Sequence, residues 1–339
     1  MSIPTIERRL FSNVSRLGFG CASLGSRVGA KKGLAALETA FDEGINWFDL
    51  APSYGDGEAE SIFSRFSRSK RSQLYICTKV GIAPGKISPI ARILKPAARF
   101  AVEVVPPIRR VVAHGRRPSE PIPINSKLIL QSVDASLRHL GTDYIDVIAL
   151  HDPKLAELAR DDVADALMRV VASGKARAAG IAGTIDAAKT ALRKGFAISH
   201  LQFPCALCSG EQGGLGSLLG EIDDSVIIVT HSMFSGQVFN FFNRHFRTDS
   251  NALAKALTEF GYLGSLNTSL QMACFDVCLA ENPEGVVLAS MFSSRHLFSN
   301  INNLYTVGSR NVVGLTTHLR RLDTIENASS HIVKNANTR

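Results

Sequence analysis

The sequence lacks the features that would place it in a membrane or an export pathway. The sequence contains no uninterrupted run of 18 apolar residues, so no membrane-spanning helix is expected. The first ten residues, MSIPTIERRL, lack the basic, apolar and small-residue order of a secretion signal, and we therefore expect a cytoplasmic protein. With 45% apolar and 20% charged residues among 339, the composition is typical of a globular protein.

The six cysteines do not form a metal-binding pattern. Cys205 and Cys208 make a single CxxC pair, and no second pair or nearby histidine completes the tetrahedral set that zinc requires. In a reducing compartment disulfides are not expected. Cys274 and Cys278 lie one helical turn apart, which indicates core positions. We therefore expect no metal site.

Positive charge is concentrated in one segment. The formal net charge is +8, and residues 82–125 carry eight of the basic side chains against two acidic ones. A protein that reads duplex nucleic acid spreads its basic residues along the element that faces the groove. The remainder of this chain is nearly neutral, so neither a nucleic-acid nor a membrane partner is expected.

Short apolar runs alternate with amphipathic stretches along the chain, as a parallel sheet with crossover helices requires. Several of the runs are apolar on both faces, which is typical of strands buried inside a ring of helices. The predicted strands are residues 16–21, 46–50, 74–79, 144–150, 177–181, 200–203, 226–230 and 286–289.

The predicted helices include residues 31–43, 58–67, 127–139, 161–173, 187–194 and 269–280. Eight strand-helix units predict a closed (β/α)8 barrel (a TIM barrel), which would occupy residues 1–339 as one domain. A doubly wound sheet is the competing fold, but Ser23 stands where the dinucleotide fingerprint of that fold needs its third glycine after Gly18 and Gly20.

Residues 82–125 interrupt the alternation after the third strand as a long insertion rich in proline and arginine. They contain eight of the 13 prolines, so a long helix cannot persist there. Loops that follow barrel strands emerge at the catalytic mouth. We expect a lid over that mouth, with a solvated excursion or a contact with a membrane surface or partner as alternatives.

Four polar side chains fall at or just after the ends of predicted strands, namely Asp49, Tyr54, Lys79 and His151. Such strand ends converge at one rim of a barrel. Lys79 closes the apolar run LYICTK and needs a partner, which Asp49 can supply. A buried ion pair is a costly way to gain stability, so we interpret the pair as functional.

The same four residues have a joint chemical interpretation. An ammonium group such as that of Lys79 favours the ionised form of a phenol, whose pKa is ordinarily near 10. A carbonyl oxygen held between Tyr54 and His151 would be polarised for reduction. Each residue alone has a structural explanation, as an ion pair, a rim tyrosine or a hydrogen-bonded histidine, but the four together predict an active site.

Four segments, GFGCASLG, GINWFDLAPSYGDGEAE, ICTKVG and LRHLGTDYIDVIALHDP, resemble the aldo-keto reductase family. The resemblance covers nearly the whole chain except residues 82–125 and a C-terminal tail, residues 315–339. It implies a (β/α)8 barrel with NAD(P)H extended across its mouth. It also implies that Asp49, Tyr54, Lys79 and His151 are the catalytic residues.

The resemblance further implies a set of cofactor-binding residues. Gln202 corresponds to the glutamine that contacts the nicotinamide amide, whereas Ala182 and Gly183 stand where the family usually has Ser-Asn. After the seventh strand, the stacking position is held by an imidazole, and the following loop presents polar and backbone groups to the pyrophosphate. The residues assigned there are His231, Ser232, Met233 and Gly236.

Residues 290–300 resemble the adenosine-phosphate loop of the family. Ser290 begins this segment and Asn300 stands at the adenine position. Arg295 can pair with a 2′-phosphate because its guanidinium is planar and permanently charged. Arg295 and the serines at the expected helix start therefore favour NADP(H) over NAD(H).

The sequence thus predicts an NAD(P)(H)-dependent oxidoreductase that interconverts a carbonyl and an alcohol, with Tyr54 as general acid or base. The alternative is a non-catalytic dinucleotide-binding barrel with a regulatory or sensor role. The expected partner is a small carbonyl or sugar-like molecule. The cations of residues 82–125 suggest the further hypothesis that this substrate is anionic.

Overall fold

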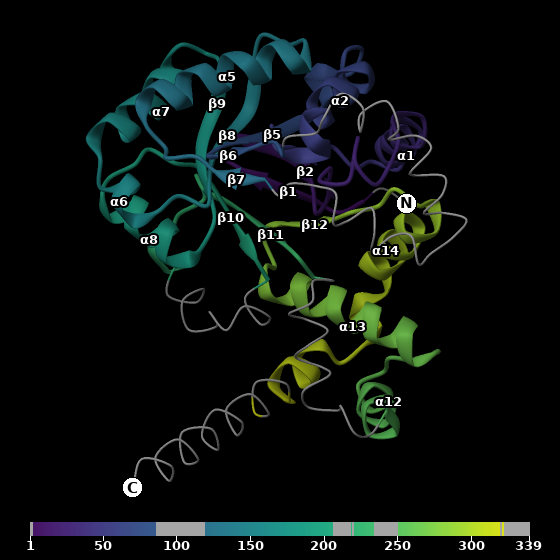
Figure 1. Ribbon diagram of the computed structural model, residues 1–339. Coiled ribbons are helices and arrows are strands. Elements are labelled where there is room, and N and C mark those ends of the chain that lie inside the picture. The colour runs from purple at the N-terminus through teal and green to yellow at the C-terminus, as the bar shows by residue number, and fades with distance from the viewer. Residues whose placement is uncertain are drawn as a thin grey trace, which may run out of the picture.

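A closed barrel of eight parallel strands forms the centre of the protein in the computed structural model, which describes residues 3–85, 119–205, 218, 220–233, 250–318 and 321 (Figure 1). Each strand pairs with the next one along the chain, and the last closes on the first. The predicted barrel and its eight predicted strands are confirmed. The strands are β3 (Leu17–Gly20), β4 (Trp47–Asp49), β5 (Tyr75–Val80), β8 (Ile145–His151), β9 (Ala176–Ala182), β10 (His200–Pro204), β11 (Ile227–His231) and β12 (Val286–Ala289).

Helices surround the strands (Figure 1). Their ends follow local capping rules: the Asn125 side chain accepts a hydrogen bond from the backbone N–H of Leu128, and Gly141 ends the same helix with φ 62°. The helices are α1 (Ala30–Asp42), α2 (Ala59–Ser67), α5 (Ser126–Leu140), α6 (Leu155–Leu158), α7 (Asp161–Ala172), α8 (Ile185–Arg193), α12 (Ser250–Glu259), α13 (Leu266–Glu281) and α14 (Ser294–Thr306), with 3-10 turns η1 (Tyr54–Gly57), η2 (Arg71–Gln73) and η3 (Val307–Ser309).

The core has two layers, because each barrel strand has an outer and an inner face. Outward side chains such as Phe48 pack with Phe63 and Ile129 of the surrounding helices. Inward side chains such as Trp47 and Val147 form a second cluster inside the barrel. Burial on both faces explains why the strands read as continuous apolar runs.

An antiparallel hairpin that the sequence analysis did not predict closes the amino end of the barrel. It consists of β1 (Thr5–Arg8) and β2 (Phe11–Ser15). Ile6, Phe11 and Val14 are buried in the same cluster as the inward barrel side chains. The ring of Phe11 meets that of Trp47 edge-on, with ring centres 5.8 Å apart. The hairpin therefore acts as an apolar plug.

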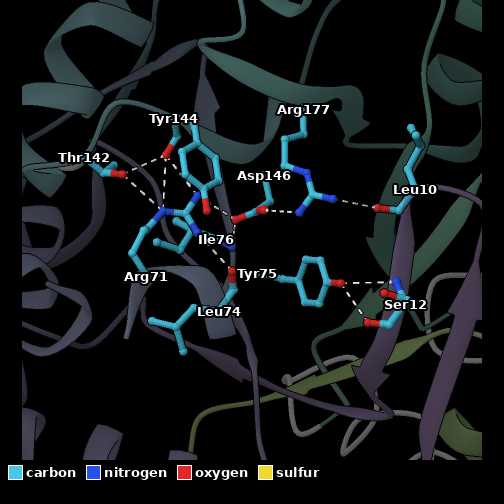
Figure 2. Close-up of polar contacts among 10 residues, drawn as sticks. All are labelled: Leu10, Ser12, Arg71, Leu74, Tyr75, Ile76, Thr142, Tyr144, Asp146 and Arg177. Carbon is cyan, nitrogen blue, oxygen red and sulfur yellow. Dashed lines mark hydrogen bonds and ion pairs between the residues drawn. The ribbon is translucent and has the colours of Figure 1, made fainter. Parts of the chain in front are cut away.

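A polar network around Asp146 lies at the amino ends of β5, β8 and β9 (Figure 2). The Asp146 carboxylate is fully buried and accepts hydrogen bonds from Arg71 Nη2 at 2.8 Å, Arg177 Nη1 at 3.0 Å and the Ile76 backbone N–H at 2.9 Å. Arg71 also donates to the backbone carbonyl of Tyr144. The network joins three neighbouring strands, so we interpret it as structural.

The two described ends of the 82–125 insertion are paired with each other. β6 (Ile82–Ala83) and β7 (Glu120–Pro121) form an antiparallel ribbon in which Ile82 lies opposite Pro121 and Ala83 opposite Glu120. Residues 86–118 lie outside the described residues, so the expected lid stays a prediction. Most of the expected C-terminal tail, residues 322–339, also lies outside them.

Two further observations bear on the expectations from the sequence. Across the described ranges, no helix is both long and apolar enough to cross a membrane. Within the same ranges, no three His, Cys, Asp or Glu side chains are grouped so that they could hold a metal ion. Cys274 and Cys278 are buried, as predicted, whereas Cys208 lies outside the described residues.

Candidate active site

A cleft of about 760 Å³ lies at the carboxyl end of the barrel, and all four predicted catalytic residues line it. Asp49 is the last residue of β4 and Lys79 the penultimate residue of β5. Tyr54 begins the turn η1, and His151 ends β8. The structure therefore brings together four side chains that are separated by up to about 100 residues in the sequence, because parallel strands end at the same rim.

Lys79 is the centre of a hydrogen-bonded group on the floor of this cleft. Its ammonium nitrogen, Nζ, lies 2.6 Å from Oδ1 of Asp49, 2.9 Å from the carbonyl oxygen of Leu50 and 3.1 Å from the hydroxyl of Tyr54. The Lys79 side chain is 1% exposed. All three of its N–H donors are thus directed to named oxygens, and one of those oxygens belongs to a phenol that faces the cleft.

The position of Tyr54 is fixed by a tight contact between two loops. Gly55 has φ 63°, and a Cβ atom added to it would lie 1.8 Å from the carbonyl oxygen of Leu24. Only glycine fits this contact, since any side chain would clash with the backbone. The turn that carries Tyr54 is therefore held against the loop that follows β3.

Burial dominates the electrostatics of the tyrosine. It raises the pKa of Tyr54 above its usual value near 10, and the nearby Lys79 ammonium acts against that rise. Burial is the largest influence on the pKa of Lys79 and acts to lower it, but Asp49, Tyr54 and Cys77 together outweigh this effect and the net shift is upward. At neutral pH, Lys79 is therefore charged and Tyr54 protonated.

His151 lies beside Tyr54, with ring centres 6.2 Å apart and the two rings nearly perpendicular. Burial, followed by the charge of Lys79, lowers the pKa of His151 to about 3. The imidazole is therefore neutral at physiological pH, and its N–H can donate one hydrogen bond to a ligand.

Five of the eight predicted cofactor-binding residues line the same cleft, namely Gln202, His231, Ser232, Met233 and Ser290. Burial lowers the pKa of His231 to about 4, and its Nδ1 lies 2.7 Å from the hydroxyl oxygen of Ser232. These residues come from the ends of β10, β11 and β12, which are consecutive in the barrel and are separated by β9 from the strand that ends in His151. Gly236 lies outside the described residues.

Gln202 is suited to hold a polar group in the cleft. Its side chain is buried. Among the described residues, Cys77 Sγ donates a long hydrogen bond, 4.0 Å, to the carboxamide oxygen Oε1. A buried amide with so little internal hydrogen bonding is well placed to bond a ligand amide. The residues present therefore fit a nicotinamide.

Arg295 and Asn300 lie farther from this cleft and do not line it. Both are on α14, so the segment expected as a loop is a loop only through Ser293 and is helical from Ser294. Arg295 is exposed in the first turn of the helix, and Asn300 is buried. An exposed arginine at a helix amino terminus is a favourable position for an anion.

The aldo/keto reductase family model matches residues 16–307, which span the barrel and every residue of the cleft. The chain belongs to the aldo/keto reductase family.

Curated relatives match over shorter stretches. The chain is 30% identical over 191 residues to D-threo-aldose 1-dehydrogenase from a Pseudomonas species, a match that covers 52% of each chain. It is 27% identical over 190 residues to L-galactose dehydrogenase from Arabidopsis thaliana, covering 52% of this chain and 49% of that one. The chain thus spans about half the length of these aldo/keto reductase relatives.

Solved structures agree on the fold. An aldo-keto reductase from Bacillus halodurans in its holo form superposes with a TM-score of 0.64 at 20% identity, over 90% of this chain and 91% of that one. An aldo-keto reductase from Klebsiella pneumoniae in complex with NADPH gives a TM-score of 0.60 at 17% identity, over 90% of both chains. Identities this low support the barrel architecture alone.

Two charged residues that line the cleft of this aldo/keto reductase were missed by the sequence analysis: Arg27, in the loop after β3, and Asp152, directly after β8. Asp152 carries the same signal as His151, because it follows a buried strand at the catalytic rim. Nothing in the sequence alone distinguishes Arg27 from the other loop arginines.

Proposed function

We propose that this protein is an NAD(P)(H)-dependent oxidoreductase that interconverts a carbonyl group and an alcohol. The observation that carries the proposal is the contact of Lys79 Nζ with both the Asp49 carboxylate and the Tyr54 hydroxyl on the floor of the cleft. An acid, a charge that stabilises its conjugate base and an open space beside both are the parts that proton transfer to a ligand requires.

In the direction of reduction, Tyr54 is the general acid. The nicotinamide group, when bound, supplies a hydride to the carbonyl carbon, while the Tyr54 hydroxyl gives its proton to the carbonyl oxygen. The Lys79 ammonium stabilises the phenolate that remains, and Asp49 keeps Lys79 in place. The reverse sequence oxidises the alcohol, with the Tyr54 phenolate as base.

His151 orients the substrate in this scheme. Its neutral imidazole donates a hydrogen bond to the carbonyl oxygen, so the oxygen is polarised before it is protonated. A charged imidazolium would compete with Tyr54 as the proton donor, and the lowered pKa of His151 prevents this at neutral pH.

The cofactor residues follow from the walls of the cleft. Gln202 would bond the nicotinamide amide, His231 would lie against the nicotinamide ring, and Ser232, Met233 and Ser290 would border the cofactor as it leaves the barrel centre. The exposed guanidinium of Arg295 favours NADP(H), because it can pair with the 2′-phosphate that NAD(H) lacks. Cofactors of this kind occur in related structures, such as the NADPH complex from Klebsiella pneumoniae.

A small sugar-like carbonyl compound is the proposed substrate. The relatives named for D-threo-aldose and L-galactose support this class. The aldehyde of an open-chain sugar would reach Tyr54 and His151, while its hydroxyl groups bond the polar rim of the cleft.

The decisive experiment replaces Tyr54 by Phe. We expect Y54F to retain NADPH binding, measured by quenching of protein fluorescence, and to lose turnover of aldehydes by about 10²-fold or more, because the neutral His151 imidazole polarises the carbonyl oxygen without supplying its proton. Y144F is the matched control, since Tyr144 lies at the opposite end of the barrel, with its ring against Arg71. Equal turnover by Y54F and the wild type would overturn the role of Tyr54. NADPH binding without turnover of any carbonyl compound by the wild type would overturn the proposed activity itself.

A further inference from the structure

Arg27 and Asp152 are two exposed charged side chains of the cleft, and neither makes a hydrogen bond or ion pair through its side chain to a residue within the described ranges. The arginines of the amino-end network behave differently, since Arg71 and Arg177 both bond to Asp146. A guanidinium and a carboxylate in a ligand cleft that have no side-chain partner among the described residues are available to a ligand.

The backbone that carries Arg27 is held in a defined conformation. The Gly25 N–H donates to the carbonyl oxygen of Val28 at 2.8 Å, and the Val28 N–H donates to that of Ser23 at 2.9 Å. This loop packs against the turn that bears Tyr54, through the contact of Gly55 with Leu24 described above. Arg27 and Tyr54 therefore belong to one packed unit, and the backbone that carries the guanidinium is fixed relative to the phenol.

The backbone of Asp152 is also anchored. Its N–H donates to the carbonyl oxygen of Ala182 at 2.7 Å, and its φ of 49° is one that aspartate tolerates better than most residues. Burial raises the pKa of Asp152, and the charge of Lys79 opposes the rise. An ionised carboxylate at this position accepts hydrogen bonds and repels anions, so it favours hydroxyl groups next to His151.

The order of strands in the barrel places the reacting group between these two charges. The loop with Arg27 follows β3, Tyr54 follows β4, Lys79 is on β5, and Asp152 follows β8; these four strands are consecutive neighbours in the barrel. A ligand whose carbonyl meets Tyr54 and His151 therefore has a carboxylate on one side and a guanidinium on the other.

We propose that the substrate is a hydroxylated carbonyl compound with a carboxylate group, of the sugar-acid class, in which Arg27 binds the carboxylate and Asp152 accepts hydrogen bonds from hydroxyl groups near the carbonyl. This inference rests on the proposed function and specifies the substrate of the same site. The carboxylate is unchanged by the reaction and serves recognition alone. A guanidinium fits it because both groups are planar and can form two parallel hydrogen bonds.

The test compares two sugars that differ in one group. D-galacturonate carries a carboxylate where D-galactose carries a hydroxymethyl group, so the ratio of their kcat/KM values isolates recognition of the charge. Wild type, R27Q, R27K and the control R68Q, whose exposed arginine lies at the carboxyl end of α2, are assayed with NADPH. The dissociation constant of NADPH is measured for each variant by fluorescence quenching.

We expect the wild type to favour D-galacturonate by about tenfold or more, the range that a hydrogen-bonded charge supplies. R27Q should bring the ratio close to one, R27K should restore part of it, and R68Q should leave it unchanged. The affinity for NADPH should stay the same in all four proteins.

The hydroxyl contact has its own readout. D152N should lower kcat/KM for both sugars by a clearly larger factor than that for butanal, an aldehyde without hydroxyl groups. An equal loss for butanal would contradict the assignment, because it would indicate a general effect on His151.

Three results would overturn the inference while leaving the proposed function intact. The first is turnover of butanal and D-galactose with no preference for D-galacturonate. The second is an unchanged ratio in R27Q. The third is weaker NADPH binding by R27Q with both sugars affected equally, which would assign Arg27 to a phosphate of the cofactor. Failure to turn over any of the three aldehydes would instead count against the proposed function.

Discussion

The two ends of the barrel each contain a buried ion pair, but the pairs are completed in different ways. At the amino end, the Asp146 carboxylate receives hydrogen bonds from two guanidinium groups and a backbone N–H, all from the protein (Figure 2). At the carboxyl end, the Lys79 ammonium contacts Asp49, a backbone carbonyl and the hydroxyl of Tyr54, which borders the cleft. The first network ends within the protein, and the second ends at a group that can exchange a proton with a ligand.

This difference shows that similar buried ion pairs can have different roles. Both pairs are desolvated, and in both cases good hydrogen bonding offsets much of the cost. At the amino end the bonds link β5, β8 and β9, so their removal should affect stability. At the carboxyl end they hold a proton donor, so their removal should affect turnover more than folding.

The largest effect is expected when both charges at the carboxyl end are removed. The double variant D49N/K79M leaves no unpaired charge in the core, so we expect a melting temperature close to that of the wild type, by circular dichroism. Its kcat/KM for aldehyde reduction should fall by about 10²- to 10⁴-fold, because nothing then stabilises the Tyr54 phenolate. A stable and active double variant would show that the pair has no catalytic role.

The amino-end network should respond in the opposite way. D146A leaves two guanidinium groups without their shared carboxylate, and we expect the free energy of unfolding, measured in urea, to fall by about 3 kcal/mol. The kcat/KM of the folded protein should remain within about threefold of the wild type, as no reacting atom is touched. D134A, which removes a half-exposed pair with Lys175, is the control and should cost under about 1 kcal/mol. A large fall in kcat/KM for D146A would mean that the two ends are coupled.

The pH dependence of reduction sharpens the same contrast. His151 has a pKa near 3 and the pKa of Tyr54 lies above its usual value, so neither group titrates between about pH 5 and 9. We expect kcat/KM for reduction to vary by less than about twofold over that range, measured in buffers of constant ionic strength. A limb of the profile near pH 6.5 would show that an imidazole titrates during the reaction and would contradict the orienting role of a neutral His151.

The smallest effect is expected from a pair near the surface, His139 with Glu60. The hydrogen bond to Glu60 raises the pKa of His139 more than partial burial lowers it. Because the pKa of His139 is raised in the folded state, the pair stabilises the protein fully at pH values below the unfolded-state pKa near 6.5. This stabilisation is lost as the pH rises through the folded-state pKa.

Urea unfolding of wild type and H139Q tests this sign. The free energy of unfolding of the wild type should exceed that of H139Q by more at pH 5 than at pH 9. The difference should stay under about 1 kcal/mol because the histidine is half exposed. An advantage that grows with pH would reverse the assignment.

The barrel could be predicted from the sequence because its strands are buried on both faces, as in the run that ends in Lys79. The plug could not, since the β1–β2 hairpin places only a few side chains, among them Phe11 and Val14, in the core and is otherwise exposed. Its burial depends on a barrel end that forms from distant residues.

The candidate site divides in the same way. The positions of Asp49 and His151 follow from the rule that parallel strands end at one rim. Arg27 could not be placed, because its loop is shaped by the packing of Leu24 on Gly55, some thirty residues away. The role of Asp146 was equally hidden, since its partners come from positions 71 and 177. The strand ends could be located from sequence patterns, whereas the contacts between loops could be seen only in the three-dimensional structure.

The short ribbon of β6 and β7 also has a practical consequence. Because Ile82 is held opposite Pro121 and Ala83 opposite Glu120, the chain leaves the barrel and returns to it at adjacent points. A tight turn of a few residues could join those points without stretching any strand. Everything between them could thus be replaced by such a turn while the eight strands are kept constant, which would give a shortened protein in which the expected lid can be tested directly.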